Sequence, residues 1–262
     1  METSKTIDDI LARLEAIITD SIETNNRLGY FAALYYKVTF RVKQGIANNE
    51  FEDGERMELL NVTFANRYLQ AHDCWKKNEP VSQSWKIAFD ATTTPLLLVL
   101  QHLLLGMNAH INLDLGIAAA EVAKGKSLQS IRNDFTLINT VIASLTYEVI
   151  NEIDRVSPLL SLLGMHAMRD NSILTQFSID NARDGAWCFA EDLSSKSDTD
   201  YITCITERDK TINKLAGGLL TTKGFLHVTL FLVHLFEWKK PSSITKVLRD
   251  YKKQSITINT NK

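Results

Sequence analysis

Apolar side chains recur every three or four residues along almost the whole chain, which is the spacing of one face of an α-helix. The clearest of these stripes run through residues 7–18, 57–71 and 128–153. Alternating strand patterns are nearly absent, and the chain shows no repeat at the periods typical of helical solenoids. The sequence therefore predicts an all-α fold, a bundle in which amphipathic helices surround a buried central helix.

Length and composition favour a single domain. The chain has 262 residues and 45% hydrophobic content, which is enough to bury a sizeable core. It contains four prolines and no linker rich in proline, glycine and serine. We therefore expect one all-helical domain over residues 1–254, followed by a flexible polar tail over residues 255–262.

Cysteine usage and the N-terminus predict a cytoplasmic protein. Cys74, Cys188 and Cys204 are odd in number and widely spaced, and no CxxC pair is present. This pattern indicates reduced thiols and gives no support for a disulfide framework or a structural zinc site. The first nine residues are polar and acidic, unlike a secretory signal.

Charge and hydropathy exclude two classes of partner. The net charge of -2 and the scattered lysines and arginines give no support for nucleic-acid binding. The apolar runs 96–105 and 219–238 are too short or too interrupted by histidine and lysine to span a membrane. We expect both to be buried helices, and the remaining partner class is a small molecule. The oligomeric state is not fixed by the sequence.

Residues 101–116 combine an interior position with many polar side chains. They follow the apolar run 96–100, yet they contain two histidines, two asparagines, a glutamine and an aspartate. Burying an unpaired polar group costs roughly 1–3 kcal/mol, and more for a charge. A metal ion, a substrate or a closed hydrogen-bond network must offset this cost.

Helical geometry favours a metal half-site in this segment. His110 and Asp114 lie one turn apart and about 40° apart around the axis, a spacing suited to zinc, iron or manganese. His102 would lie roughly 12 Å further along a straight helix. A break at Gly106–Asn108 would bring it closer as a third ligand or a catalytic group. The alternative is that these histidines are hydrogen-bonded core residues.

The opposite side of the same helix carries a second polar seam. Gln101, Asn108 and Asn112 fall within about 40° of one another. They could bond neighbouring helices or contact a ligand, so Asn108 and Asn112 are candidate substrate-binding residues.

A second polar cluster lies at residues 180–187. Asp180 and Asp184 share a helix face, and Arg183 is one turn from Trp187. We take Asp184 and Arg183 as candidate catalytic residues and Trp187, together with Asp90, as candidate substrate-binding residues. A surface ion pair worth a few tenths of a kcal/mol is the alternative.

Four segments resemble an uncharacterised all-helical family, catalogued as a domain of unknown function. They are residues 64–69, residues 80–89, the sequence QHLLLGMNAHINLDLG at 101–116, and residues 182–187. The similarity spans about residues 7–195. It implies a helical domain and supports the choice of residues, but it implies no particular activity.

The order of histidines is also similar to a motif of the zinc-dependent phospholipase C and P1-type nuclease group. Those enzymes are all-α phosphoesterases with a His-x-Leu-Gly-Asp…His helix, which here corresponds to His102…His110. Gly106 stands where their aspartate is expected, and the chain lacks their N-terminal tryptophan. This resemblance implies a helical metallo-hydrolase.

Three functional hypotheses stay open. The first is a metal-dependent hydrolase in which metal-bound water is the nucleophile, with its site between the 96–116 and 180–187 helices. The second is a metal-free enzyme in which His110 and Asp114 act as acid and base on a hydrophobic small molecule, a lipid or secondary metabolite, in a pocket of Trp85, Phe89 and Trp187. The third is a non-catalytic ligand-binding or interaction protein.

Overall fold

The structure is an all-α bundle, as predicted. The computed structural model describes residues 3–160, 179–221 and 225–250, and these contain eleven α-helices and no strand. The predicted tail lies outside the described residues. The α-helices are α1 (Ile7–Glu23), α2 (Leu28–Ala47), α3 (Gly54–Lys76), α4 (Gln83–Asp90), α5 (Val99–Ala109), α6 (Gly116–Val122), α7 (Arg132–Val156), α10 (Ile179–Ser194), α11 (Asp198–Leu220), α12 (Phe225–Phe236) and α13 (Pro241–Arg249).

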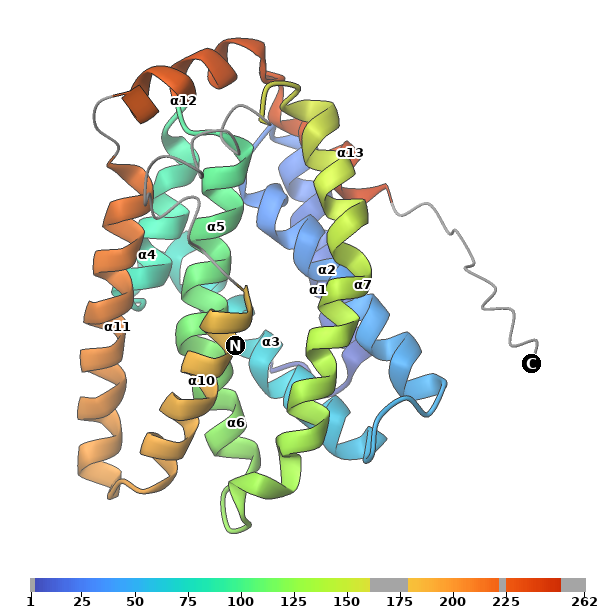
Figure 1. Cartoon of the computed structure of the whole chain (residues 1–262), viewed down its shortest axis with the longest axis vertical. Coiled ribbons are helices and arrows are strands. Elements are labelled where there is room, and N and C mark those ends of the chain that lie inside the picture. Colours follow the sequence, from blue (N-terminus) through green and yellow to red (C-terminus); the bar gives the residue numbers. More distant parts are fainter. Residues whose placement is uncertain (1–2, 161–178, 222–224, 251–262) are drawn as a thin grey trace.

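One continuous helical rod runs through the middle of the bundle (Figure 1). It consists of α5, a single π-helical segment η2 (His110–Leu115) and α6. Residues 99–122 are long and apolar enough to cross a membrane, and 89% of their most apolar window is buried inside the fold. The rod contacts α2, α3, α4, α10 and α11, so these helices supply the inner surface that its side chains meet.

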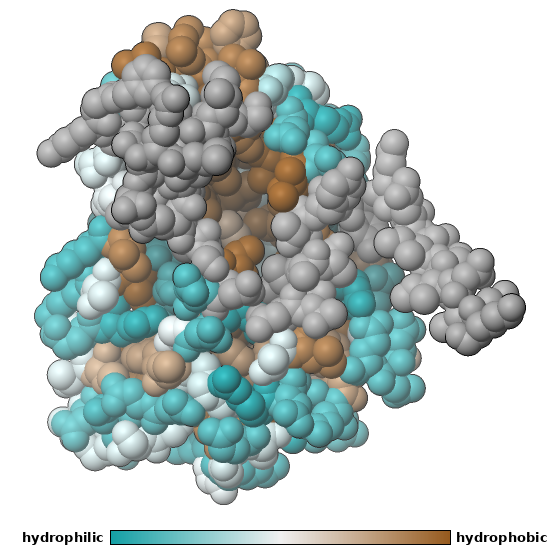
Figure 2. All heavy atoms as spheres, viewed as in Figure 1, coloured by the Kyte–Doolittle hydropathy of each residue, from teal (hydrophilic) through white to brown (hydrophobic). Residues whose placement is uncertain are grey.

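The second apolar run is not buried throughout. It is divided between the end of α11 and α12, which lies across the top of the bundle in Figure 1. Phe231 is 53% exposed and Phe236 is 62% exposed. The expectation of a fully buried helix is therefore wrong for the outer side of α12, where Figure 2 shows hydrophobic surface.

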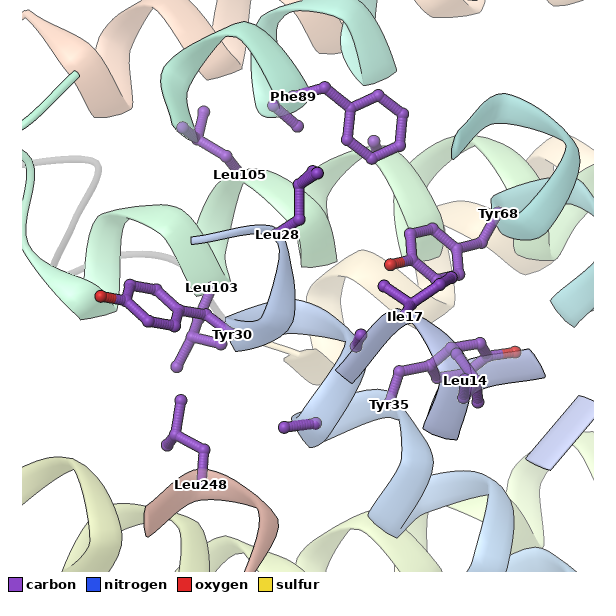
Figure 3. Close-up of a cluster of buried hydrophobic side chains, with 14 of the residues drawn as sticks. Leu14, Ile17, Leu28, Tyr30, Tyr35, Tyr68, Phe89, Leu103, Leu105 and Leu248 are labelled. Carbon is purple, nitrogen blue, oxygen red and sulfur yellow. The ribbon is translucent and has the colours of Figure 1, made fainter. Parts of the chain in front are cut away.

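The core is built around the central rod by residues from helices distant in sequence. Leu103 and Leu105 of α5 are buried with Leu28 and Tyr30 of α2, and Tyr68 of α3 belongs to the same cluster (Figure 3). A second cluster surrounds α6 with side chains of α7 and α10. The amphipathic stripes predicted from the sequence are the faces that meet here.

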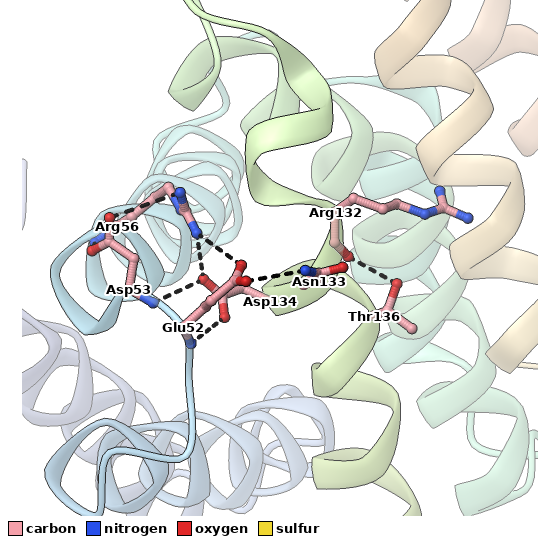
Figure 4. A network of polar contacts seen from close by, with 7 residues as sticks. All are labelled: Glu52, Asp53, Arg56, Arg132, Asn133, Asp134 and Thr136. Carbon is pink, nitrogen blue, oxygen red and sulfur yellow. Dashed lines mark hydrogen bonds and ion pairs between the residues drawn. The ribbon is translucent and has the colours of Figure 1, made fainter.

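A buried carboxylate from α7 organises the start of α3. Asp134 is 2% exposed, and its oxygens accept hydrogen bonds from the backbone N–H groups of Glu52 and Asp53 at 2.7 and 3.3 Å. It also accepts from Arg56 Nη2 at 2.8 Å, as Figure 4 shows. The contact joins residues about 80 positions apart, so local sequence could not reveal it.

Two other helices begin against carboxylates from distant parts of the chain. Asp209 of α11 accepts from the backbone N–H groups of Gln83 and Ser84 at the start of α4. Glu237 accepts from the backbone N–H of Val99 at 3.1 Å, and burial raises the pKa of this carboxyl to about 7. Helix α5 begins at Val99, where Glu237 accepts from the first backbone N–H and Gln101 Oε1 accepts from that of Leu98 at 3.0 Å.

Candidate functional site

The expected break at Gly106–Asn108 is wrong. Helix α5 continues through Ala109, and the irregular segment is the π-helix that starts at His110. A Cβ atom on Gly106 would lie 2.5 Å from Phe31, so glycine is needed there for the close approach of an aromatic ring. Short π-helical segments inside α-helices are frequent at functional sites, which draws attention to residues 110–115.

Asp114 holds side chains from three elements together. It is 2% exposed, and Oδ1 accepts from Arg67 Nε of α3 at 3.0 Å. Oδ2 accepts from Trp85 Nε1 of α4 at 2.8 Å and lies 3.3 Å from His110 Nδ1. The predicted pairing of His110 with Asp114 is therefore present, and both carboxylate oxygens are engaged by N–H groups.

His110 is a buried imidazole in an aromatic cage. Its ring stacks on Phe64 with centroids 3.6 Å apart and meets the edge of Tyr35 at 4.4 Å. Burial lowers the pKa of His110, while the contact with Asp114 opposes this change. The ring is therefore neutral at pH 7. Because a carboxylate only accepts, the ring hydrogen belongs on Nδ1 and Nε2 is left as an acceptor.

An apolar cavity of about 220 Å³ lies beside His110. Its walls come from α2, α3, α5, η2, α7 and α10 and are mainly aliphatic and aromatic, including Leu34, Val38, Met107 and Ile153. Within the part of the chain that the structure describes, His110 Nε2 and Asn61 Oδ1 are buried without a hydrogen-bond partner. Tyr35 Oη, which lines the same cavity, is also buried without a partner among these residues, so a mainly apolar site offers polar atoms to a ligand.

Of the candidate residues in segment 180–187, Arg183 lines the same cavity, whereas Asp184 and Trp187 do not. Arg183 is buried, lines the cavity and donates from Nη2 to the backbone oxygen of Phe135 at 2.6 Å. Asp184 points to the exposed side of α10. Trp187 is buried but bonds Glu191, outside the lining of this cavity. The side chain of Asp180 lies outside the described residues.

His102 occupies a separate place. It lines a cavity of about 20 Å³ with Arg27 and Trp85, and Phe31 lies between the two histidine sites because it lines both cavities. Both ring nitrogens of His102 are buried without a partner among the described residues. The space suits one water molecule bonded to the imidazole.

No metal donor set is assembled by residues 3–160, 179–221 and 225–250. These ranges contain no group of three His, Cys, Asp or Glu side chains placed to hold an ion. His110 and Asp114 form a pair, and His102 is not its third member. His166 lies outside the described residues. The zinc, iron or manganese site therefore remains a prediction.

His102 is expected to make folding sensitive to acid. Burial lowers its pKa from 6.5 to about 3 in the folded protein. An unfolded chain binds this proton first, so the free energy of unfolding should fall as the pH drops from 6.5 toward 3, by up to about 1.4 kcal/mol per pH unit. Urea denaturation across this pH range should show that the free energy of unfolding falls less steeply with decreasing pH for His102→Gln than for the wild type. Equal slopes for both proteins would contradict the assignment.

The second polar seam faces α11. Gln101 Nε2 donates to the backbone oxygen of Leu219 at 2.8 Å, and Asn108 Nδ2 donates to that of Ile212 at 3.1 Å. Asn112 Nδ2 donates to Asn108 Oδ1 at 3.0 Å. The shared face predicted for these three residues is confirmed, and it ties the central rod to a neighbouring helix.

Asp90 lies apart from the central cavity. It ends α4, accepts from Trp75 Nε1 at 2.9 Å and pairs with Lys86. It lines an open surface depression of about 570 Å³ with Gln83 and Leu220. If Asp90 contacts a ligand, that ligand would bind in the surface depression and not in the cavity beside His110.

Sequence reasoning missed Arg67 and Asn61 as members of the site. Both lie on α3, and Arg67 falls inside the segment 64–69 that carries the family resemblance. That position was the available signal for Arg67. The signal for Asn61 was weaker. It is a polar side chain within the apolar stripe of residues 57–65, and the same kind of signal marked residues 101–116.

The fold and the site define an all-α protein whose central rod carries a buried His–Asp pair beside an apolar cavity. The chain belongs to a family of unknown function, DUF5995, whose model matches residues 7–222. No curated protein and no solved structure matches the chain significantly. The predicted membership of an uncharacterised family is confirmed, and the match extends past residue 195. It does not test the similarity to zinc-dependent phosphoesterases.

Proposed function

We propose that the protein binds a hydrophobic small molecule in the cavity beside His110 and acts on it through His110 and Asp114 as an acid–base pair. The observation that carries this proposal is the state of His110. Its imidazole lies on the wall of a mainly apolar cavity, with Nδ1 facing the Asp114 carboxylate and Nε2 unpaired among the described residues, and burial lowers its pKa.

The chemistry follows from this arrangement. The acceptor Nε2 can take a proton from a hydroxyl or an activated C–H group of a bound molecule. Asp114 then stabilises the imidazolium through Nδ1, and Arg67 and Trp85 keep the carboxylate in place. Asn61 and Arg183 also line the cavity and are suited to a polar group of the ligand.

The cavity defines the class of ligand. Its volume of about 220 Å³ is small for a binding pocket, and its lining is mainly apolar. The ligand is therefore a compact apolar molecule with one or two polar groups, such as a small lipid or a secondary metabolite.

The metal-dependent hydrolase has less support. Both oxygens of Asp114 already accept hydrogen bonds, from Arg67 and Trp85, and the Arg67 guanidinium beside them opposes a second cation. A metal at His110 would need its remaining ligands from outside the described residues. Elemental analysis of untagged protein tests it directly, since a stoichiometric metal that is lost in His110→Gln would favour the hydrolase.

The proposal can be tested without knowing the substrate. We expect a neutral fluorescent probe such as N-phenyl-1-naphthylamine to bind the wild type, and Met107→Trp, which fills the cavity, to weaken binding by at least about tenfold. His110→Gln should still bind it. A small-molecule extract incubated with the wild type and followed by mass spectrometry should lose specific components.

The two variants separate the outcomes. His110→Gln keeps an amide donor for Asp114 but has no basic nitrogen, so it should leave the extract unchanged. Consumption at the wild-type rate by His110→Gln would contradict acid–base catalysis. Probe binding lost in Met107→Trp, with no component consumed by the wild type, would favour the non-catalytic binding protein.

A further inference from the structure

Helix α12 presents a continuous apolar face to solvent. Its outward residues follow the helical spacing i, i+3, i+4, i+7, i+8 and are between 42% and 62% exposed: Val228, Phe231, Leu232, Leu235 and Phe236. Trp238, which follows the helix, is 42% exposed. The patch lies where Figure 2 shows brown surface at the top of the molecule. Contiguous exposed apolar surface of this kind marks an interaction site.

The inner side of α12 anchors the helix to the bundle. Leu230 and Val233 pack with Leu98 at the start of the central rod. The backbone N–H of Trp238 donates to Val156 of α7 at 2.9 Å, and Glu237 accepts from Val99. The outer face can therefore meet a partner while the helix stays in place.

The part of the sequence that contains this apolar face is basic. Residues 222–253 contain seven lysines and arginines against two acidic residues, although the whole chain has a net charge of -2. One of those acidic residues, Glu237, is buried. Lys239 and Lys240 follow directly after Trp238 and are exposed. The rest of the chain is correspondingly acidic, so the positive charge is local to this end.

We propose that α12 docks on an anionic lipid surface. An apolar helical face with a flanking tryptophan and lysines is the pattern of helices that lie in the membrane interface. Twelve residues are too few to cross a bilayer, which needs about 20, so the helix would lie in the plane of the surface. The phenylalanine and leucine side chains would enter the acyl region while Lys239 and Lys240 contact anionic headgroups.

The local charge favours lipid over a second copy of the chain. A twofold symmetric contact through α12 would bring the same basic segment of both copies together, and like charges would oppose it. An anionic surface attracts that segment. The proposal does not depend on the function proposed for the His110 cavity.

Vesicle flotation of the full-length protein tests the proposal. We expect the wild type to float with phosphatidylcholine vesicles that contain phosphatidylglycerol. Phe231→Ser/Phe236→Ser should weaken this binding by at least about tenfold. Lys239→Ala/Lys240→Ala should weaken binding to the anionic vesicles by roughly tenfold or more and should leave binding to pure phosphatidylcholine vesicles unchanged.

Ile202→Ser is the matched control, because Ile202 is 69% exposed on α11, away from the patch. It should bind as the wild type does. The urea midpoints of all variants should agree, since the replaced side chains are exposed. Three results would overturn the proposal: no binding of the wild type to anionic vesicles, equal binding by Phe231→Ser/Phe236→Ser, or a lipid-free dimer that the same double variant abolishes in light scattering.

Discussion

Asp114→Ala is expected to lower the free energy of unfolding by about 3–5 kcal/mol, among the largest effects of any single substitution in this chain. The carboxylate is 2% exposed and accepts from both Arg67 and Trp85 while it faces His110. Its removal leaves N–H groups of three elements without this acceptor, and those of Trp85 and His110 are buried. Urea denaturation followed by circular dichroism measures the loss.

Glu121→Ala provides the matched control. Glu121 is the other acidic partner of Arg67, at 3.8 Å from Nη1, but its side chain is 45% exposed. An exposed ion pair contributes less than about 1 kcal/mol. If Asp114→Ala cost no more than Glu121→Ala, Asp114 would not organise the site, and the orientation of His110 would need another source.

Helix positions could be predicted where the signals are local. The stripes at residues 7–18 and 57–71 lie within α1 and α3, and Ser82 accepts from the backbone N–H of Trp85 at the start of α4. Apolar spacing and capping residues act within one or two turns, so a single segment contains the information. The contact of Glu237 with Val99 at the start of α5 could not be predicted, because the two residues lie 138 positions apart.

The candidate site shows the same division. The pairing of His110 with Asp114 is a property of one helix turn and was predictable from spacing. Arg67 joins this pair from 47 residues away, and the cavity needs six elements in their final positions. Gly106 was interpreted as a flexible point, whereas the structure shows it as the place where Phe31 packs against the rod.

Buried charge is the feature least accessible from the sequence. Lys37 lies on α2 and is 1% exposed, and it forms an ion pair with Glu152 of α7. Nothing in the local pattern distinguishes Lys37 from the solvent-facing lysines. Its neighbour Val38 and the neighbour of Glu152, Ile153, both line the cavity beside His110. The ion pair therefore joins two walls of that cavity.

Glu152→Leu is expected to cost about 3–5 kcal/mol of unfolding free energy, because the buried ammonium of Lys37 loses its carboxylate. Lys37→Met/Glu152→Leu should recover most of this loss and could exceed the stability of the wild type, since it replaces a desolvated ion pair with apolar contacts of similar volume. Urea denaturation of both single variants and the double variant gives the coupling energy between the two side chains.

Lys43→Met is the comparison at the surface, because Lys43 pairs with Asp8 where both side chains are largely exposed. It should cost less than about 1 kcal/mol. If the double variant had the same low unfolding free energy as Glu152→Leu, the two charges would contribute to stability beyond neutralising each other. Probe binding to the double variant then shows whether the ion pair matters for the cavity. Unchanged affinity would mean that the pair serves folding specificity. Lost affinity would mean that the pair sets the spacing of α2 and α7 that the ligand requires.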